Sequence, residues 1–416
     1  MSRKRLEKPI TVPSSLFSEA GRFRYQQLGF DVTHRSPTSK ARIGQLKTPH
    51  GTIETPNYIF CGTKGAIKNL HPHQMREAGA DIILGNTYHL MIQPGPDLVA
   101  EMGGLQSWTQ WQGPMMTDSG GFQIFSMGHG SVADEIKGRN SDKNRATSLI
   151  KIGEEGAKFR SYKDGAEMHL TPEYSIEIQR KLGADLIYQL DECTPYHVDK
   201  AYTERSMYMS QRWGDRSLAA FNRFDDGTQG LYGVTQGGVY HDLRKISCDY
   251  IRERPFFGTA IGGCLGGSRS EFYDVVSVNA ENVHPDRPVH LLGVGYIEDV
   301  FAFVRMGIDT FDCVSPTRIA RHGWALMKGV PDNRLNLRNQ KFRNDPTPLD
   351  ETSPLLASNS YSKSYIHHLL RAGEMLAYQI IAQHNVAVMT RLMREVRAAI
   401  KSDTLDALES EWIVGF

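Results

Sequence analysis

Two aspartates occupy positions where a carboxylate could act on a sugar. Asp118 and Asp312 close the short apolar runs that begin at Pro114 and Thr310. When two carboxyl groups lie about 5 Å apart beside a sugar, one can attack the anomeric carbon while the other shuttles a proton. The alternative is a structural role, because aspartates at strand ends often cap helices or loops. The pair therefore predicts glycosidic chemistry if the fold brings both side chains into one mouth.

The two aspartates belong to a pattern of eight short apolar runs that end in small or polar residues. Strands buried on both faces need such runs, and parallel strands need a crossover helix between them. Amphipathic stretches of helical length separate most of the runs, so the sequence predicts an α/β fold, a closed (β/α)8 TIM barrel. Its chemistry would sit at the C-terminal strand ends, where Asp118, Asp191, Gln236 and Asp312 fall. The runs are residues 56–62, 81–86, 114–121, 186–192, 231–238, 258–264, 289–295 and 310–313.

Composition narrows the class of protein. The chain has 416 residues and a formal net charge of +1, enough length for a large core but no strong overall field to attract nucleic acid. Its five cysteines form no C-x-x-C motif and no disulfide pattern, which favours a reducing compartment. The basic N-terminus lacks the apolar stretch of a signal peptide, and no run reaches membrane-spanning length. We expect a soluble cytoplasmic protein that does not bind membranes.

The sequence divides into three parts. Residues 1–50 are predicted to form an N-terminal extension, with short strands at 23–25 and 41–44 that close the bottom of the barrel. Residues 51–345 form the catalytic barrel, with an insertion at 126–163 whose polar centre indicates a surface loop. Residues 346–416 form a C-terminal helical subdomain. Its main element is predicted as one helical stretch from 362 to about 401, with an inward stripe of Leu369, Gly373, Leu376, Ile380 and His384.

An ordered set of motifs extends from about residue 40 to about residue 400. Taken together, these motifs resemble those of the tRNA-guanine transglycosylase (queuine tRNA-ribosyltransferase) family, and no single one would carry the resemblance alone. In chain order they are Gly85-Asn-Thr-Tyr-His-Leu90, Asp118-Ser-Gly-Gly-Phe-Gln123, Asp191-Glu-Cys-Thr-Pro195, Gln236-Gly-Gly238, Ala260-Ile-Gly-Gly-Cys264, Gly293-Val-Gly295, Phe311-Asp-Cys-Val-Ser-Pro-Thr-Arg318 and Tyr365-Ile-His-His-Leu369.

The resemblance implies a pentosyltransferase that exchanges guanine at the wobble position of tRNAs with a GUN anticodon for a 7-deazaguanine base. Asp312 matches the nucleophile that holds the ribose covalently, and Asp118 matches the acid/base residue. Asp191 and Gln236 match the residues that read the base after it has left the anticodon stack. The base-binding residues implied are Asp118, Phe122, Asp191, Gln236, Gly263, Cys264 and Gly266. For Phe122, stacking on the base and packing in the core remain equal alternatives.

The resemblance also implies how the RNA is held. Expected partners are the tRNAs for aspartate, asparagine, histidine and tyrosine, with queuine or preQ1 as the incoming base and a homodimer as one assembly. The basic run from Lys328 to Arg343 would widen the RNA-binding patch, or would simply be solvated. The residues matching tRNA-contacting positions are Gly293, Val294, Gly295, Tyr296, Thr317, Arg318 and Arg321.

The chain departs from the family at its zinc site. Members carry a C-x-C-x-x-C loop completed by a histidine, and here these positions are Ser353, Leu355, Ser358 and His384. A structural zinc ion needs about four good ligands, so we predict no metal and no cofactor. Leu355 and Leu356 are expected to replace the metal by apolar packing, with His384 a hydrogen-bonded core residue.

Two further departures concern the substrate. Gly266 stands where preQ1-using members carry a bulky valine, and Ser268 stands where a glutamate is usual. The lost side chain would make room for queuine, with its cyclopentenediol. The insertion could cover the mouth or contact a partner. The leading alternative function is a non-catalytic tRNA-binding or partner subunit; an archaeosine-type enzyme fits less well because the additional C-terminal RNA-binding domain is missing.

Overall fold

A closed parallel barrel of eight strands forms the centre of the molecule. The computed structural model describes residues 25–128, 148–224, 226–263 and 266–414. Each of the eight predicted runs overlaps one barrel strand, with β11 beginning one residue before its run, so the TIM-barrel prediction is confirmed. The strands are β4 (Asn57–Cys61), β5 (Ile83–Gly85), β6 (Met115–Thr117), β10 (Leu186–Tyr188), β11 (Gly230–Thr235), β12 (Gly258–Ile261), β13 (Val289–Leu291) and β14 (Thr310–Cys313).

The barrel closes where β14 pairs in parallel with β4, from Thr310 beside Asn57 to Cys313 beside Phe60. This closure places the last predicted run next to the first. Asp312 therefore lies at the same end of the barrel as Asp118, which follows β6. The strand interiors are almost fully buried, because one face fills the barrel and the other packs under the helices.

Helices follow most of the strands and cover the outside of the barrel. The boundaries of α7 illustrate why they form where they do: the Thr171 side chain accepts a hydrogen bond from the Tyr174 N–H, Pro172 is the first residue, and Gly183 ends the helix at φ +75. The covering helices are α1 (Pro72–Glu77), α2 (Thr87–Ile92), α3 (Pro96–Glu101), α4 (Gly104–Thr109), α5 (Gly121–Gly128), α7 (Pro172–Leu182), α8 (Lys200–Phe224), α9 (His241–Arg252), α10 (Arg269–Asn282), α11 (Ile297–Arg305) and α12 (Ser315–Ala320).

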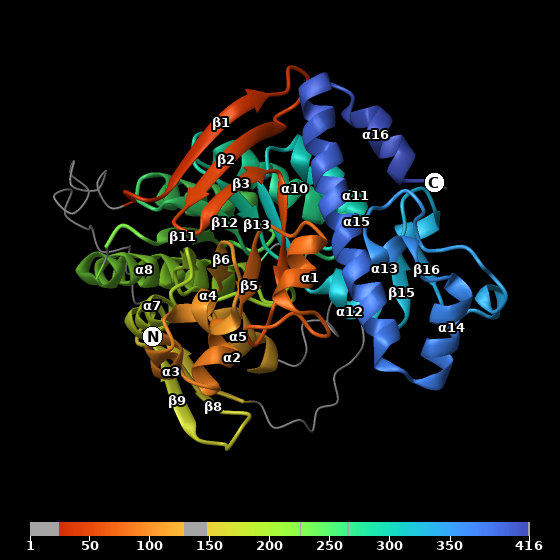
Figure 1. The fold of residues 1–416 in the computed structure, drawn as a ribbon. Coiled ribbons are helices and arrows are strands. Elements are labelled where there is room, and N and C mark those ends of the chain that lie inside the picture. Colours follow the sequence, from red (N-terminus) through yellow and green to blue (C-terminus); the bar gives the residue numbers. More distant parts are fainter. Residues whose placement is uncertain (1–24, 129–147, 225, 264–265, 415–416) are drawn as a thin grey trace.

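A three-stranded antiparallel sheet covers the N-terminal end of the barrel (Figure 1). It consists of β1 (Gly29–Arg35), β2 (Arg42–Thr48) and β3 (Gly51–Thr55). Leu46 and Ile53 pack in one apolar cluster with Ile59, Leu186 and Tyr232 of the barrel. The expected strand at 41–44 is the start of β2. Of the expected strand at 23–25, the first two residues lie outside the described residues and the third is in a turn.

The insertion after α5 contains two strands of a second antiparallel sheet. These are β7 (Leu149–Gly153) and β8 (Gly156–Arg160), and β8 pairs with β9 (Glu167–Leu170). The polar centre that was expected to be a surface loop lies within 129–147, outside the described residues.

The C-terminal elements gather on one side of the barrel, where α15 packs against β4, α12 and β15 (Figure 1). The prediction of one helical stretch is wrong, because Gly373 adopts φ +79 and ends α14 before α15 begins. Leu376 is consequently 39% exposed, whereas Leu369, Ile380 and His384 are buried as expected. The elements are β15 (Trp324–Leu326), η3 (Pro331–Asn333), β16 (Arg334–Asn336), η4 (Gln340–Phe342), α13 (Leu356–Asn359), α14 (Lys363–Ala372), α15 (Met375–Ser402) and α16 (Leu405–Trp412). None of the helices in the described ranges combines the length and apolar character needed to cross a membrane.

Candidate active site

Three hydrogen-bond donors hold Asp118 at the C-terminal end of β6. Its Oδ2 accepts from Asn86 Nδ2 (2.5 Å) and from Gln123 Nε2 (2.7 Å), and its Oδ1 accepts from the Thr87 N–H (2.8 Å). Burial raises the pKa of Asp118 above its ordinary value, the three donors oppose that rise, and the nearby charge of Asp312 adds to it. A carboxyl group in this environment can exchange a proton with a substrate.

Asp312 is anchored through only one of its oxygens. Oδ1 accepts from the Gly293 N–H and from Nε2 of His290, both at 3.1 Å. Among the described residues, Oδ2 receives only the Cys61 thiol, at 3.4 Å. Nδ1 of His290 lies 2.9 Å from Thr310 Oγ1, so a proton on Nε2 lets His290 donate to Asp312 and accept from the threonine hydroxyl. Oδ2 is therefore the oxygen left free to react.

Asp191 and Gln236 face each other at the ends of β10 and β11. Gln236 Nε2 donates to Asp191 Oδ2 at 2.6 Å, and Ser119 Oγ donates to Oδ1 at 3.4 Å. Burial raises the pKa of Asp191 to about 6, against the effect of these donors. Gln236 Oε1 is buried and has no hydrogen-bond partner among the described residues. The pair thus presents a carboxylate and an amide side by side.

The remaining base-binding candidates lie around this pair. Gly263 has φ +59, and a Cβ there would come within 2.5 Å of Gln236 Oε1, so only glycine fits. Gly266 lines a small recess together with Thr194, Tyr196 and other residues of the neighbouring loops. Phe122 is 46% exposed, which excludes the core-packing alternative. Cys264 lies outside the described residues.

The tRNA-contacting candidates separate into exposed and buried residues. Tyr296 is 64% exposed and Arg318 is exposed on α12, directly after β14. Burial lowers the pKa of the half-buried Arg321, and the charge of Arg318 lowers it further, so the two cations lie near each other. Val294 and Thr317 are buried, as is part of Gly295. The side chains of Val294 and Thr317 are covered by the protein and Gly295 has none, so a contact with RNA at these positions would use the main chain.

Two basic side chains of the run from Lys328 to Arg343 bind other parts of the protein. Lys328 forms ion pairs with Glu395 (2.9 Å) and Glu411 (2.7 Å). Arg338 donates to the Leu370 carbonyl at 3.2 Å. These two side chains bind the C-terminal subdomain, whereas Lys341 and Arg343 of the same run are exposed, so a role of the run in RNA binding stays a prediction.

Several residues that hold the site were not assigned a role from the sequence. Asn86, Thr87 and Gln123 bind Asp118, and His290 binds Asp312. Asn86 directly follows β5, so its place at a strand end was the available signal. His290 lies inside the apolar run of β13, where a histidine is usually a core residue, and the parallel pairing of β13 with β14 brings it to Asp312.

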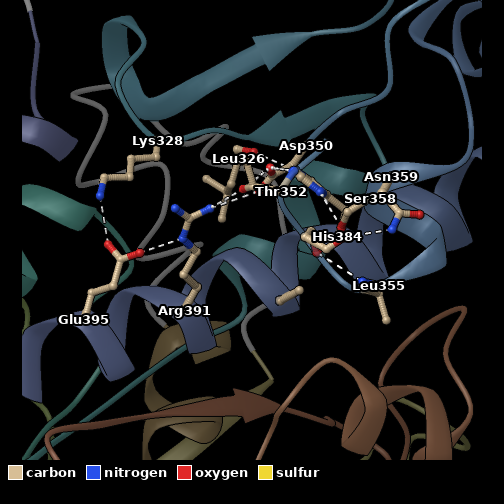
Figure 2. A network of polar contacts seen from close by, with 12 residues as sticks. Leu326, Lys328, Asp350, Thr352, Leu355, Ser358, Asn359, His384, Arg391 and Glu395 are labelled. Atoms are coloured by element: carbon tan, nitrogen blue, oxygen red, sulfur yellow. Dashed lines mark hydrogen bonds and ion pairs between the residues drawn. The ribbon is translucent and has the colours of Figure 1, made fainter. Parts of the chain in front are cut away.

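The position of the family's zinc site holds hydrogen bonds instead of a ligand set. His384 is buried; its Nδ1 lies 2.9 Å from Ser358 Oγ and its Nε2 lies 2.7 Å from the Leu326 carbonyl oxygen (Figure 2). Burial lowers its pKa to about 4, so the ring is neutral near pH 7. The other three positions offer two hydroxyls and the alkyl group of Leu355, which do not fit zinc. In the described parts of the chain, no group of three or more histidine, cysteine or acidic side chains is arranged to hold a metal ion.

A chain of ion pairs continues from this loop to α15. Asp350 accepts from Arg391 at 3.1 Å, and Arg391 donates to Glu395 at 2.6 Å (Figure 2). Leu355 and Leu356 were both expected to replace the zinc ion by apolar packing. This prediction is wrong for Leu356, which is 71% exposed, whereas Leu355 packs partly against the core. Polar contacts, more than apolar packing, thus join the loop to the helix. We call Asp350, Ser358, His384, Arg391 and Glu395 the polar clasp.

The fold and the site define a class of enzyme. A closed β/α barrel that carries two buried carboxyl groups in one mouth, one proton-exchanging and one with a free oxygen, is suited to act on a glycosidic bond. Residues 36–415 match the family described as queuine tRNA-ribosyltransferase.

Relatives bearing that name match nearly the whole chain. The protein from Roseiflexus sp. (strain RS-1) is 44% identical over 396 residues, which is 93% of this chain and 99% of the relative. The protein from Nostoc sp. (strain PCC 7120) is 42% identical over 385 residues, covering 92% and 96%. That from Protochlamydia amoebophila is 41% identical over 376 residues, covering 90% and 96%. The chain belongs to the queuine tRNA-ribosyltransferase family, and it is a pentosyltransferase.

Proposed function

We propose that this enzyme exchanges guanine at the wobble position of GUN-anticodon tRNAs for a 7-deazaguanine base, as a step of queuosine modification. The observation that carries the proposal is the unequal environment of the two carboxyl groups. Asp312 keeps Oδ2 nearly free, and burial favours a proton on Asp118. One group is suited to attack carbon and the other to move a proton.

The reaction then proceeds in two displacements. Asp312 Oδ2 attacks C1′ of the wobble ribose, the C1′–N bond to guanine breaks, and Asp118 gives a proton to the departing base. The incoming base returns a proton to Asp118 and attacks C1′, and the bond to Asp312 breaks. The strand is never cut, because the ribose remains attached to its phosphates throughout.

Base recognition falls to the residues around Asp191. Its carboxylate suits the ring N–H and exocyclic amine of guanine, which are donors. The amide of Gln236 and the N–H of Gly263 suit the carbonyl oxygen of the base. The exposed ring of Phe122 supports stacking, and Cys264 completes the set implied by the family.

For the incoming base, we propose queuine in preference to preQ1. Gly266 adds no side chain to the recess beside Gly263. Competition of the two bases for tRNA labelling tests this, and strict use of preQ1 would contradict it.

On the RNA side, Arg318 and Arg321 are proposed to bind phosphates next to the reacting nucleotide, and Tyr296 is proposed to contact the anticodon loop. The substrates would be the tRNAs for aspartate, asparagine, histidine and tyrosine. The exposure of Arg318 and Tyr296 beside the nucleophile's strand supports these roles.

We further propose a zinc-free homodimer. A groove of about 520 Å³ lies between α1, α13 and α15, lined by Leu355, Leu356 and Leu376 among others. Its exposed leucines support burial against a second copy. Light scattering after size-exclusion chromatography tests the assembly, and a monomer at micromolar concentration would contradict it.

Guanine exchange is the decisive experiment. Purified enzyme, labelled guanine and a GUN-anticodon tRNA should give labelled tRNA, with the same tRNA carrying a wobble adenine as the negative control. Absence of labelling by the folded protein would contradict the proposed reaction and would favour the non-catalytic partner subunit.

A further inference from the structure

Arg244 is a fully buried cation to which no catalytic or binding role has been assigned above. It lies in the first turn of α9 with 0% relative exposure. Its Nε donates to the Gly238 carbonyl (2.7 Å) and its Nη2 to the Gly263 carbonyl (2.7 Å). Its Nη1 donates to the carbonyls of Gly262 (2.6 Å) and Thr235 (3.3 Å). Within the described residues, these four bonds all go to the main chain, not to a carboxylate.

The four acceptors belong to two neighbouring loops. Thr235, the last residue of β11, and Gly238 flank Gln236, and Gly262 and Gly263 follow β12. These are the loops that carry the proposed readers of the base carbonyl. The first turn of α9 can approach the loop after β11 because Gly237 has no side chain: a Cβ there would lie 2.9 Å from the main-chain nitrogen of Arg244. A single guanidinium thus joins both loops from behind.

The contact with Gly262 also sets the direction of a peptide N–H. In a trans peptide, the carbonyl of one residue and the N–H of the next point to opposite sides. Since the Gly262 carbonyl points to Arg244, the Gly263 N–H points away from it. The same glycine faces the Gln236 side chain, because a Cβ on it would meet Gln236 Oε1 at 2.5 Å. The N–H is therefore directed away from the protein interior behind the loops.

Arginine suits this task better than any other cation. Its planar fork offers five N–H donors in fixed directions, whereas lysine is a compact point charge on a flexible stem. A buried charge is costly unless it is well hydrogen-bonded, so the guanidinium keeps the four carbonyls in place. Loss of the fork would release both loops at once.

We propose that Arg244 is a positioning residue for base recognition, which fixes the Gly262–Gly263 peptide and the Gln236 loop so that both readers face the carbonyl oxygen of the base. The inference rests on the proposed function and deepens it. It predicts a defect confined to bases that carry this carbonyl oxygen.

The test compares Arg244→Lys with Arg252→Lys. Arg252 is an exposed arginine on the same helix, paired with Asp249. In the exchange assay, Arg244→Lys should raise the KM for guanine by about tenfold or more, with tRNA affinity within about twofold of wild type. Arg252→Lys should leave both unchanged. An unchanged KM for guanine in a folded Arg244→Lys variant would overturn the proposal.

A second probe separates positioning from general damage. 2-Aminopurine lacks the carbonyl oxygen, so its inhibition constant should be similar in wild type and Arg244→Lys, and the preference for guanine should shrink. Equal weakening of both bases would overturn the proposal. Failure of wild type to exchange guanine would instead contradict the proposed function itself.

A crystal structure of wild type with guanine decides the question if Arg244→Lys does not fold. The Gly263 N–H should then lie within hydrogen-bond distance of the guanine carbonyl oxygen while Arg244 keeps its bond to the Gly262 carbonyl. A guanine complex in which either contact is missing would overturn the proposal.

Discussion

At the residue scale, the two aspartates differ in which oxygens are occupied. Both oxygens of Asp118 accept hydrogen bonds from nitrogen, whereas in Asp312 only Oδ1 does so within the part of the chain that the structure describes. The difference suits Asp118 to carry a proton and Asp312 to act as the nucleophile. The carboxylate of Asp312 and the bond from His290 to its Oδ1 can therefore be tested separately.

Removal of the Asp312 carboxylate should abolish the exchange reaction and leave tRNA binding intact. Asp312→Ala should form no covalent tRNA–enzyme complex on a denaturing gel, while tRNA affinity stays within a few-fold because phosphate contacts supply most of it. Asp286→Ala, an exposed change at the opposite end of the barrel, is the control. Turnover by Asp312→Ala would contradict the nucleophile assignment.

The bond from His290 should matter for the rate. His290→Phe keeps the ring but removes the donor to Asp312 Oδ1, so kcat should fall about 10- to 100-fold with little change in the KM for tRNA. Thr310→Val is the matched control, because it removes the other partner of His290 and leaves the bond to Asp312. His290→Gln, which can still donate, should recover part of the rate. Equal losses in Thr310→Val and His290→Phe would indicate a purely structural role.

At the element scale, the polar clasp makes the stability of the C-terminal subdomain depend on pH. The folded-state pKa of His384 is lowered from 6.5 to about 4, so the unfolded chain binds the extra proton between these values. The contribution of the neutral, buried His384 to the free energy of unfolding is complete above pH 6.5. It is lost as the pH falls toward 4, by about 3 kcal/mol in all.

His384→Gln provides the comparison, because glutamine can donate to Leu326 and accept from Ser358 without titrating. Urea titrations at pH 7, 5.5 and 4.5 would give the free energy of unfolding of both proteins. As the pH falls, this free energy should decrease more for wild type than for His384→Gln. Parallel curves would show that His384 is not buried as a neutral ring.

The same element should accept a metal when thiolates are supplied. Ser353→Cys, Leu355→Cys and Ser358→Cys together would give His384 three thiolate partners, a complete tetrahedral set. Elemental analysis after mild chelation should find about one zinc ion per chain in the triple variant and none bound in stoichiometric amount in wild type. Stoichiometric zinc in wild type would contradict the zinc-free prediction.

At the scale of the whole molecule, the near-zero net charge means that RNA affinity depends on local cations. Arg318→Ala should weaken tRNA binding and reduce the slope of log affinity against log salt by about 0.7 to 0.9. Arg35→Ala, on the sheet that covers the other end of the barrel, should leave the slope unchanged. An unchanged slope for Arg318→Ala would contradict its phosphate contact.

The barrel could be predicted from the sequence because buried parallel strands need continuous apolar runs, and each run overlaps a strand. The site was only partly readable. Asp118, Asp191, Gln236 and Asp312 stand at strand ends. His290 reaches Asp312 only through the pairing of β13 with β14, and Arg244 reaches the loops after β11 and β12 from α9. The break at Gly373 was missed because the apolar stripe on either side resembles one continuous face.

The polar clasp also has a consequence for the cell that makes this protein. If folding of the C-terminal subdomain needs no metal, the supply of active enzyme should not fall when zinc is scarce. Nor would oxidants inactivate the clasp, because it contains no thiol to oxidise. Wobble-base modification would then persist under zinc starvation, a condition that would disable a thiolate-bound zinc site.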